Sequence, residues 1–403
     1  MCTTITAPEF CPNPQCSYFE RQLAAERRWY RRAGTYHTLS RGDIQRFCCL
    51  ACGKSCSTQT FSVHYWSHSD CDLRRLREDL ESASGLRQIA RRWRVSYRVV
   101  QNRIRRLARN ALALLHTAAA ASALNGITEH LVIDGFESFV RSQYFPAEFN
   151  LVVGKSSQYL YGFSFAALRR KGRMNALQRS RRAMIDAHYS PPARSVFVAL
   201  RMLLDDLSAA IAAGCRYSPR IIYSDEHRSY PAVLRSLPQL HTLMLEQRLR
   251  HLQISSRRAR TTANRLFAVN YLDRQIRKNC GEHARETVKQ AREVNCSLER
   301  MAVFALSHNF FTPHRISNRA DTTAEPTHAD AASMADTPQV AWLRSRLFTH
   351  RHLHAHLRSP GQWISCIWRH LHENPPAVDF STTERSPQVM ALAPAAIAAH
   401  LAA

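Results

Sequence analysis

The sequence predicts a multi-domain protein in which a small metal-binding segment and an α-helical segment precede a larger α/β core. Its 403 residues exceed one average domain. Eight of the 12 cysteines lie between Cys2 and Cys71. Beyond His130, apolar runs typical of strands alternate with helical stretches. The expected segments are 1–66 (cysteine-rich), 70–125 (helical and basic), 128–315 (α/β), 316–338 (linker or disordered) and 339–403 (helical extension and tail).

The balance of charge indicates a polyanionic partner. Lys and Arg number 56 against 31 Asp and Glu, which gives a formal net charge of +25 and a pI near 10.3. Arginine pairs such as Arg91-Arg92 and Arg181-Arg182 recur along the chain instead of forming one basic tail. Guanidinium groups bind phosphate through paired hydrogen bonds. The composition therefore argues against an enzyme of small metabolites and predicts binding to nucleic acid, with a solvated basic surface as the alternative.

The sequence predicts a reducing compartment and no membrane partner. The first residues lack the basic and apolar regions of a signal peptide, and no apolar run is long enough to span a bilayer. The alanine-rich stretch 111–124 is interrupted by His116, and we interpret it as a helix that joins two domains. Clustered cysteines in a reducing compartment predict metal binding before disulfides.

Two cysteine pairs predict a structural zinc site of the zinc-ribbon kind. Cys11 and Cys16 form the first pair, and Cys49 and Cys52 form the second. Two such turns complete a tetrahedral four-thiolate site without an open position, so this Zn²⁺ would hold the fold. The pairs lie further apart than is usual for a ribbon. Three other residues remain candidate ligands: Cys48, Cys56 and His64.

Residues 84–109 predict a helix-turn-helix. Ser96 is a natural N-cap for the second helix, and three apolar residues (Val100, Ile104 and Leu107) then recur at helical spacing. The second helix of this motif enters the major groove of DNA. We expect its exposed face to contact DNA through Tyr97, Arg98, Gln101, Asn102 and Arg105. The turn position that favours glycine is Arg94.

Two aspartates follow apolar strands in the α/β region. Strands are expected at 131–133, 149–153, 159–165 and 221–223, with helices near 196–211, 264–311 and 340–372. Asp134 ends the first of these strands and Asp225 follows the last. Carboxylates at the ends of adjacent parallel strands can share two Mg²⁺ or Mn²⁺ ions about 4 Å apart, which clamp a phosphodiester between them. The alternatives are a turn at Asp134-Gly135 and a helix cap at Asp225.

This order of segments resembles bacterial insertion-sequence transposases of the DDE type, whose catalytic domain has the RNase H fold. The resemblance extends from Cys11 to about Arg315. It is carried by Arg46-Phe47, Cys49, Cys52-Gly53-Lys54, the Asp134 strand, Ser224-Asp225-Glu226-His227, Tyr230-Pro231, 269–274, Arg285-Glu286-Thr287 and His308-Asn309. It implies an RNase H-like core in residues 128–315, location in the bacterial cytoplasm, and Asp134 and Asp225 as catalytic ligands of Mg²⁺ or Mn²⁺.

This chain departs from the family's pattern at the position of the third acidic residue. The family has a glutamate at the start of the late helix, where this chain has Phe267. The nearest acid on the same helix face is Asp273, three residues after Asn270, and we assign it as the third ligand. Glu286 is the alternative, and Glu137 and Glu226 are neighbouring carboxylates.

The resemblance implies a DNA transposase that acts as a dimer or larger assembly. It would hydrolyse a phosphodiester at each element end, and the freed 3′-OH would attack target DNA. The arginine-rich segments 169–183 and 245–260 would line the DNA channel. One alternative is a catalytically inactive, transposase-derived DNA-binding protein, which Phe267 in place of the family's glutamate favours. The other is a nuclease of the same fold.

Overall fold

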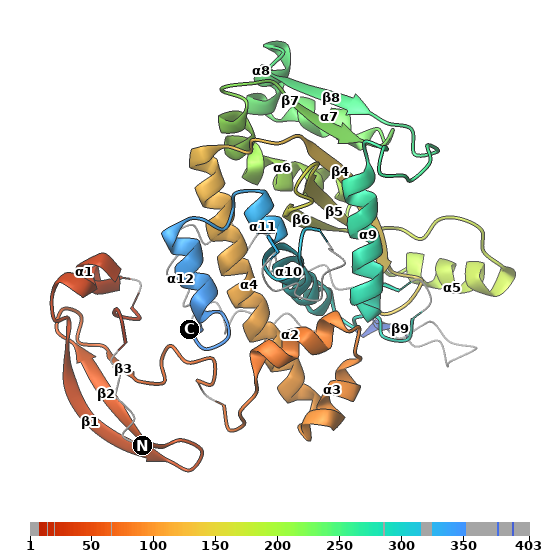
Figure 1. Ribbon diagram of the computed structural model, residues 1–403. Coiled ribbons are helices and arrows are strands. Elements are labelled where there is room, and N and C mark those ends of the chain that lie inside the picture. Colours follow the sequence, from red (N-terminus) through yellow and green to blue (C-terminus); the bar gives the residue numbers. More distant parts are fainter. Residues whose placement is uncertain are drawn as a thin grey trace.

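The computed structural model describes residues 8–13, 15–19, 21–65, 67–284, 287–315 and 325–351, together with two short strands, β9 (Ala377–Val378) and β10 (Val389–Met390). The described chain has a mixed α/β architecture, with a small sheet at one side and a larger sheet surrounded by helices (Figure 1).

The N-terminal part forms a three-stranded antiparallel sheet. Its strands are β1 (Tyr30–Thr38), β2 (Gly42–Cys49) and β3 (Ser55–Ser57), preceded by η1 (Ser17–Phe19) and α1 (Arg21–Glu26). A compact core beneath the sheet contains Phe10, Trp29 and Phe47. Because this core is small, a metal that crosslinks the loops would add much of its stability.

Three helices follow and lead into the larger domain. They are α2 (Leu73–Glu81), α3 (Leu86–Trp93) and α4 (Tyr97–Asn125). Asp72 caps α2 and Ser96 caps α4 with their side chains. The expected helix at 111–124 is the second half of α4, whose 29 residues span about 44 Å. α4 packs against α3 at one end and against α6 and α10 further along.

Arg94 adopts the left-handed conformation that joins α3 to α4. Its φ of 52° and ψ of 41° are the values that a glycine would adopt without strain. We expect Arg94→Gly to raise the free energy of unfolding by about 1 kcal/mol, because the exposed side chain contributes little there. Arg91→Gly, inside α3, is the matched control and should lower it by about 1 kcal/mol. Denaturant unfolding measures both, and a destabilised Arg94→Gly would contradict the assignment of strain.

The larger sheet has five strands in the order β6-β5-β4-β7-β8. The strands β4 (Leu131–Phe139), β5 (Pro146–Gly154) and β6 (Leu160–Ala167) form an antiparallel meander, whereas β7 (Arg220–Ser224) and β8 (Leu249–Gln253) run parallel to β4. The four expected strands are present. β8 was not predicted, because its sequence Leu-Arg-His-Leu-Gln is mostly polar and it occupies the sheet edge.

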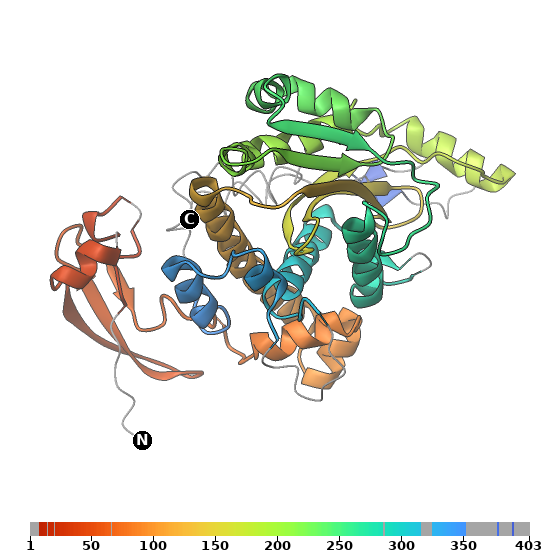
Figure 2. The ribbon, with the colours of Figure 1, turned by 45° about the horizontal axis from the view of Figure 1, so that its top comes forward.

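Helices cover both faces of this sheet. They are α5 (Ala176–Asp186), α6 (Ser195–Gly214), α7 (Ser229–Ser236), α8 (Pro238–Leu245), α9 (Phe267–Asn279), η2 (Gly281–His283) and α10 (Val294–Phe310). Figure 2 shows α7 and α8 on one side of the sheet and α9 and α10 on the other. The expected helical stretch 264–311 is therefore divided into two main helices. All residues of α10 are buried, which makes it the central helix of the domain.

The segment after residue 315 corrects one expectation. Within the predicted linker 316–338, residues 325–338 are ordered: Thr327 caps the short helix α11 (His328–Ala331), and α12 (Pro338–Arg346) follows. The buried His328 ring stacks on His308 of α10 at 4.0 Å between centroids and hydrogen-bonds the Ser157 carbonyl. Residues 316–324 and most of the tail beyond 351 lie outside the described residues.

Candidate active site and cysteine cluster

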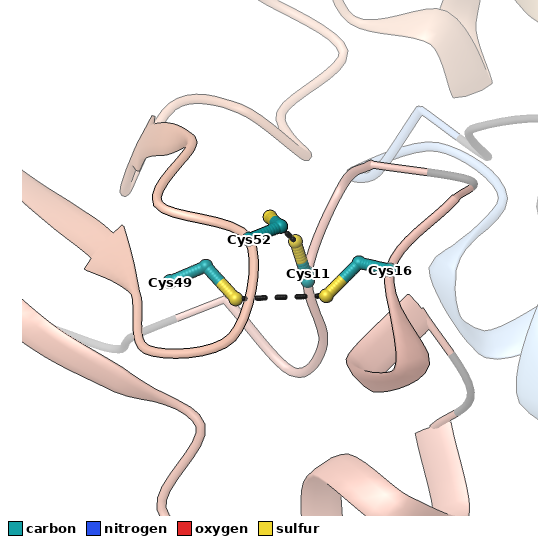
Figure 3. Close-up of side chains that lie close together, drawn as sticks. All are labelled: Cys11, Cys16, Cys49 and Cys52. Carbon is teal, nitrogen blue, oxygen red and sulfur yellow. Dashed lines mark hydrogen bonds between the residues drawn. The ribbon is translucent and has the colours of Figure 1, made fainter.

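The cysteines Cys11, Cys16, Cys49 and Cys52 form a cluster that could hold a metal such as zinc. Their sulfur atoms all lie within 4.8 Å of one another (Figure 3). The Sγ–Sγ distance is 3.6 Å between Cys11 and Cys52 and 3.7 Å between Cys16 and Cys49. Sulfurs around a tetrahedral Zn²⁺ with bonds of about 2.3 Å lie about 3.8 Å apart, whereas disulfide sulfurs lie about 2.0 Å apart. The spacing therefore fits a metal ion bound by four thiolates.

Backbone turns present the thiols on both sides of the cluster. The Cys16 amide donates to the Asn13 carbonyl, and the Gly53 amide donates to the Cys49 carbonyl. Gly53 has a φ of +70°, as such a turn requires.

The other candidate ligands lie elsewhere. Cys48 precedes Cys49 on β2 and so points to the opposite face, where its thiol donates to the Gly53 carbonyl at 3.2 Å. Cys56 is buried in the sheet core. His64 lies beside Asp70, with 3.6 Å between the nearest nitrogen and oxygen.

Asp134, Asp225 and Asp273 line one polar cavity of about 260 Å³. The cavity opens where β4 and β7 approach α9, so residues separated by 139 positions (134 to 273) meet there. Its other lining residues are mostly polar or cationic: Gly135, Glu137, Ser255, Ser256, Arg258, Arg260, Asn264, Leu266, Asn270 and Arg277. Among the described residues only the cysteine cluster has three or more ligand atoms within 4.8 Å, so the aspartates are spaced more widely than thiolates around zinc.

Hydrogen bonds fix two of the carboxylates. Asp134 Oδ1 accepts the Gly135 amide at 2.8 Å and lies 3.5 Å from the buried Tyr230 hydroxyl. Asp225 Oδ1 accepts the His227 amide at 2.8 Å, which closes a tight turn directly after β7. Beneath this turn, Ser224 and His251 are hydrogen-bonded between β7 and β8. Backbone amides therefore fix both aspartates. Asp225 directly follows β7, whereas the expectation that Asp134 ends its strand is wrong, because β4 continues to Phe139 and pairs with β5 along its whole length.

Burial and mutual repulsion disfavour the charged forms of two carboxylates in the cavity. Burial, together with the negative charge of Asp225, raises the pKa of Asp134 to about 6. Burial and the charge of Asp134 raise the pKa of Asp273 to about 7, although Arg277 and Arg260 oppose this shift. The buried Oδ1 of Asp273 has no hydrogen-bond partner among the described residues. An unpaired buried carboxylate oxygen is costly, and a divalent cation would remove that cost.

Glu148 is a further carboxylate beside this site that the sequence interpretation missed. It lies on β5 opposite Glu137, and a Cβ atom built on Gly135 would fall 2.6 Å from its Cδ. The missing side chain at position 135 therefore makes room for the Glu148 carboxyl. Burial and the charges of Glu137, Asp134 and Asp225 raise its pKa to about 7. The glycine directly after Asp134 was the available signal in the sequence, but it does not reveal which residue fills the space.

The raised pKa of Asp273 predicts a cost in stability at neutral pH. A carboxyl whose pKa rises on folding from its ordinary value near 3.8 to about 7 favours the folded state less and less as the pH rises between those values. Without added Mg²⁺ or Mn²⁺, Asp273→Asn should therefore be about 2 to 4 kcal/mol more stable than the unmodified chain above pH 7, with the difference vanishing below pH 4. Denaturant unfolding across this pH range measures it.

Asp186→Asn is the opposite control. Hydrogen bonds from Arg169 and Arg182 outweigh partial burial and lower the pKa of Asp186, so this variant should be less stable at neutral pH. Saturating Mg²⁺ should stabilise the unmodified chain and leave Asp273→Asn unchanged. Equal stability of Asp273→Asn and the unmodified chain at pH 8 would contradict the buried, unpaired state of this carboxylate.

The predicted DNA-contacting face of α4 is only partly exposed. Tyr97, Arg98 and Asn102 are exposed. The expected exposure is wrong for Gln101, which is buried and donates to Glu299 of α10 at 3.3 Å. Arg105 forms an ion pair with the same buried carboxylate at 2.9 Å. α10 therefore covers one side of the face, because its glutamate needs these partners to be buried.

The alternative acids occupy different positions. Glu137 lines the cavity, whereas Glu226 is exposed outside its lining. Phe267 begins α9 and stacks on Tyr271, so it takes no part in the cavity. Glu286 lies outside the described residues.

Comparison with known protein families, curated proteins and solved structures finds no match to this chain. Among the described residues, no helix combines the length and apolar character needed to cross a membrane.

Proposed function

We propose that the chain is a DNA transposase of the DDE type, which hydrolyses a phosphodiester at DNA ends and transfers the freed strand to a target. The observation that carries the proposal is the common cavity of Asp134, Asp225 and Asp273, with the buried, unpartnered Oδ1 of Asp273. The strand order with an antiparallel meander followed by two parallel strands is consistent with an RNase H-like core. The net charge of +25 supports DNA as the substrate.

The residues of the cavity suit Mg²⁺ or Mn²⁺. Carboxylate oxygens are hard ligands, which these ions prefer over the thiolates that suit zinc. Asp134 within β4 and Asp225 directly after the neighbouring strand β7 would hold the ions from one side, and Asp273 from α9 would hold them from the other. When bound, the ions activate the attacking oxygen and stabilise the leaving oxygen.

Residues around the cavity would position the DNA and the metal ligands. Arg258 and Arg260 lie at the cavity and would pair with the phosphate oxygens on either side of the scissile bond. Tyr230 would keep Asp134 oriented through its hydroxyl. Attack by water breaks the bond between phosphorus and the 3′ oxygen and leaves a 3′-OH and a 5′-phosphate. That 3′-OH would then attack a target phosphodiester and displace another 3′-OH.

Helix α4 would contact the element ends through its exposed residues. Tyr97, Arg98 and Asn102 at its N-terminal end are available, as the motif requires. Gln101 and Arg105 would reach DNA only after leaving Glu299. The basic segment around α5, with the exposed Arg169 and Arg173 before it, would extend the DNA path. Two ends must be joined together, so we propose a homo-oligomer on DNA.

The inactive DNA-binding protein is the competing proposal, and Phe267 in place of the family's glutamate is the feature that favours it. A nicking assay separates the two. A supercoiled plasmid that carries the DNA flanking this gene is incubated with the protein and Mg²⁺, Mn²⁺ or Ca²⁺. Nicks with 3′-OH termini that appear with Mg²⁺ or Mn²⁺ support the enzyme. Binding in a gel-shift assay without nicking under either ion contradicts it and supports the binder.

A further inference from the structure

The hairpin of β1 and β2 carries charge that neither the cysteine cluster nor the acidic cavity uses. Arg31 and Arg32 on β1 are exposed, as is Arg46 on β2. Among the described residues no acid pairs with these three. The one acid on the two strands, Asp43, hydrogen-bonds His37 at 2.8 Å. The exposed arginines therefore present uncompensated positive charge.

The outer part of the hairpin stands as a two-stranded ribbon. The third strand pairs only with residues 46–48, so the segment from Gly34 to Gln45 has no further strand beside it. β1 has no buried residue along its nine positions, and within this segment of β2 only Ile44 is buried. The tip of the hairpin lies at the opposite end of β2 from Cys49, roughly 20 Å away. Figure 1 shows the small sheet at one side of the molecule, apart from the five-stranded sheet.

An apolar side chain stands at the tip of this ribbon. Leu39 is fully exposed, in a turn where polar residues are usual. Two residues later, Arg41 pairs with Asp70. Leu39 lines a groove between the hairpin and residues 55–68 but belongs to none of the hydrophobic cores of the described residues. A lone exposed leucine is unremarkable on a surface, but one at the end of a basic ribbon has a specific use. Proteins that bend DNA insert such side chains between base pairs.

We propose that the β1–β2 hairpin is a DNA-bending arm, in which Arg31, Arg32 and Arg46 bind phosphates and Leu39 inserts between base pairs from the minor groove. Charge complementarity favours a nucleic acid as the partner, and the proposed function makes that partner double-stranded DNA. Pairing with a second copy along the β1 edge is disfavoured, because exposed arginines and the bulge at Gly34 are features that protect sheet edges. The inference rests on the proposed function only in taking DNA as the ligand.

Bending of a 40-bp duplex, labelled with a donor and an acceptor at its two ends, tests the arm. The full-length, zinc-loaded protein is used in Ca²⁺, so that cleavage does not contribute. The unmodified chain should increase energy transfer, and Leu39→Ala should abolish the increase while weakening binding less than about 10-fold. Leu124→Ala, which changes an exposed leucine at the end of α4, is the matched control and should bend DNA normally.

The arginines are tested through salt dependence. The double variant Arg31→Gln/Arg32→Gln should reduce, by about 2, the slope of the logarithm of the binding constant against the logarithm of the salt concentration. The matched control is Arg201→Gln/Arg216→Gln, which should leave the slope unchanged. Arg201 is exposed within α6, and Arg216 is exposed just after it. Zinc content checks that each variant retains the sheet. Unchanged bending by Leu39→Ala, or variants that alter oligomeric state in light scattering without altering DNA binding, would overturn the arm. Bending without nicking would contradict the proposed catalysis alone, and nicking without bending would contradict the arm alone.

Discussion

Asp225→Asn is expected to lower Mg²⁺-dependent nicking at least about 100-fold while leaving DNA affinity within a few-fold. The substitution keeps the shape of the side chain and removes the charge that would bind the cation at the end of β7. Loss of a residue that merely supports a metal ligand costs about 10- to 100-fold, so loss of a ligand should cost no less. Initial rates on the supercoiled plasmid and a gel shift of the same DNA measure the two quantities.

A matched substitution separates this effect from a general loss of charge. Asp205 is exposed on α6 and does not line the cavity, so Asp205→Asn should nick DNA at the rate of the unmodified chain. Asp134→Asn and Asp273→Asn should behave like Asp225→Asn. If Asp273→Asn retained full activity, the third ligand would have to be another acid, and Glu148 would be the first to test because its carboxyl lies against Gly135.

Cys49→Ser is expected to abolish zinc binding and unfold the N-terminal sheet while the five-stranded sheet stays folded. Structural four-thiolate sites contribute about 10 to 16 kcal/mol of binding free energy, far more than the small core around Trp29 and Phe47 can replace. Zinc content by atomic absorption and limited proteolysis, with cleavage expected within residues 21–65, report the loss. Treatment of the unmodified chain with a strong zinc chelator should give the same cleavage pattern.

Cys48→Ser is the control, since it changes the adjacent residue. Because the Cys48 thiol points to the opposite face of β2, this variant should keep one zinc per chain and resist proteolysis. Loss of zinc in Cys48→Ser together with its retention in Cys49→Ser would contradict the assignment of the four ligands.

The sequence predicted those parts of the structure that depend on local patterns. The cysteine pairs, the cap at Ser96 and the apolar runs 131–133 and 221–223 are encoded within a few residues, and the structure has them. The continuation of β4 beyond Asp134 to Phe139 was missed, because it depends on pairing with β5. The choice of Cys49 over Cys48 needed the strand register, because neighbouring strand residues point to opposite faces.

What the sequence could not predict depends on partners distant in the chain. The burial of Gln101 follows from Glu299, which lies 198 residues later, and the room for Glu148 follows from Gly135 on the neighbouring strand. The order in 325–338 follows from the stacking of His328 on His308, although the composition there has no periodicity. Each of these contacts arises when distant segments pack, so no local pattern records it.

Anomalous diffraction from crystals grown with Mn²⁺ tests most directly the claim that the three aspartates form a cation-dependent centre. Data at the manganese edge should show density between Asp134, Asp225 and Asp273, and data at the zinc edge should show a separate peak among the four cysteines. Manganese density in the cavity that disappears in Asp225→Asn would support the account. An empty cavity at saturating Mn²⁺, with DNA bound and the cysteine site occupied, would contradict it.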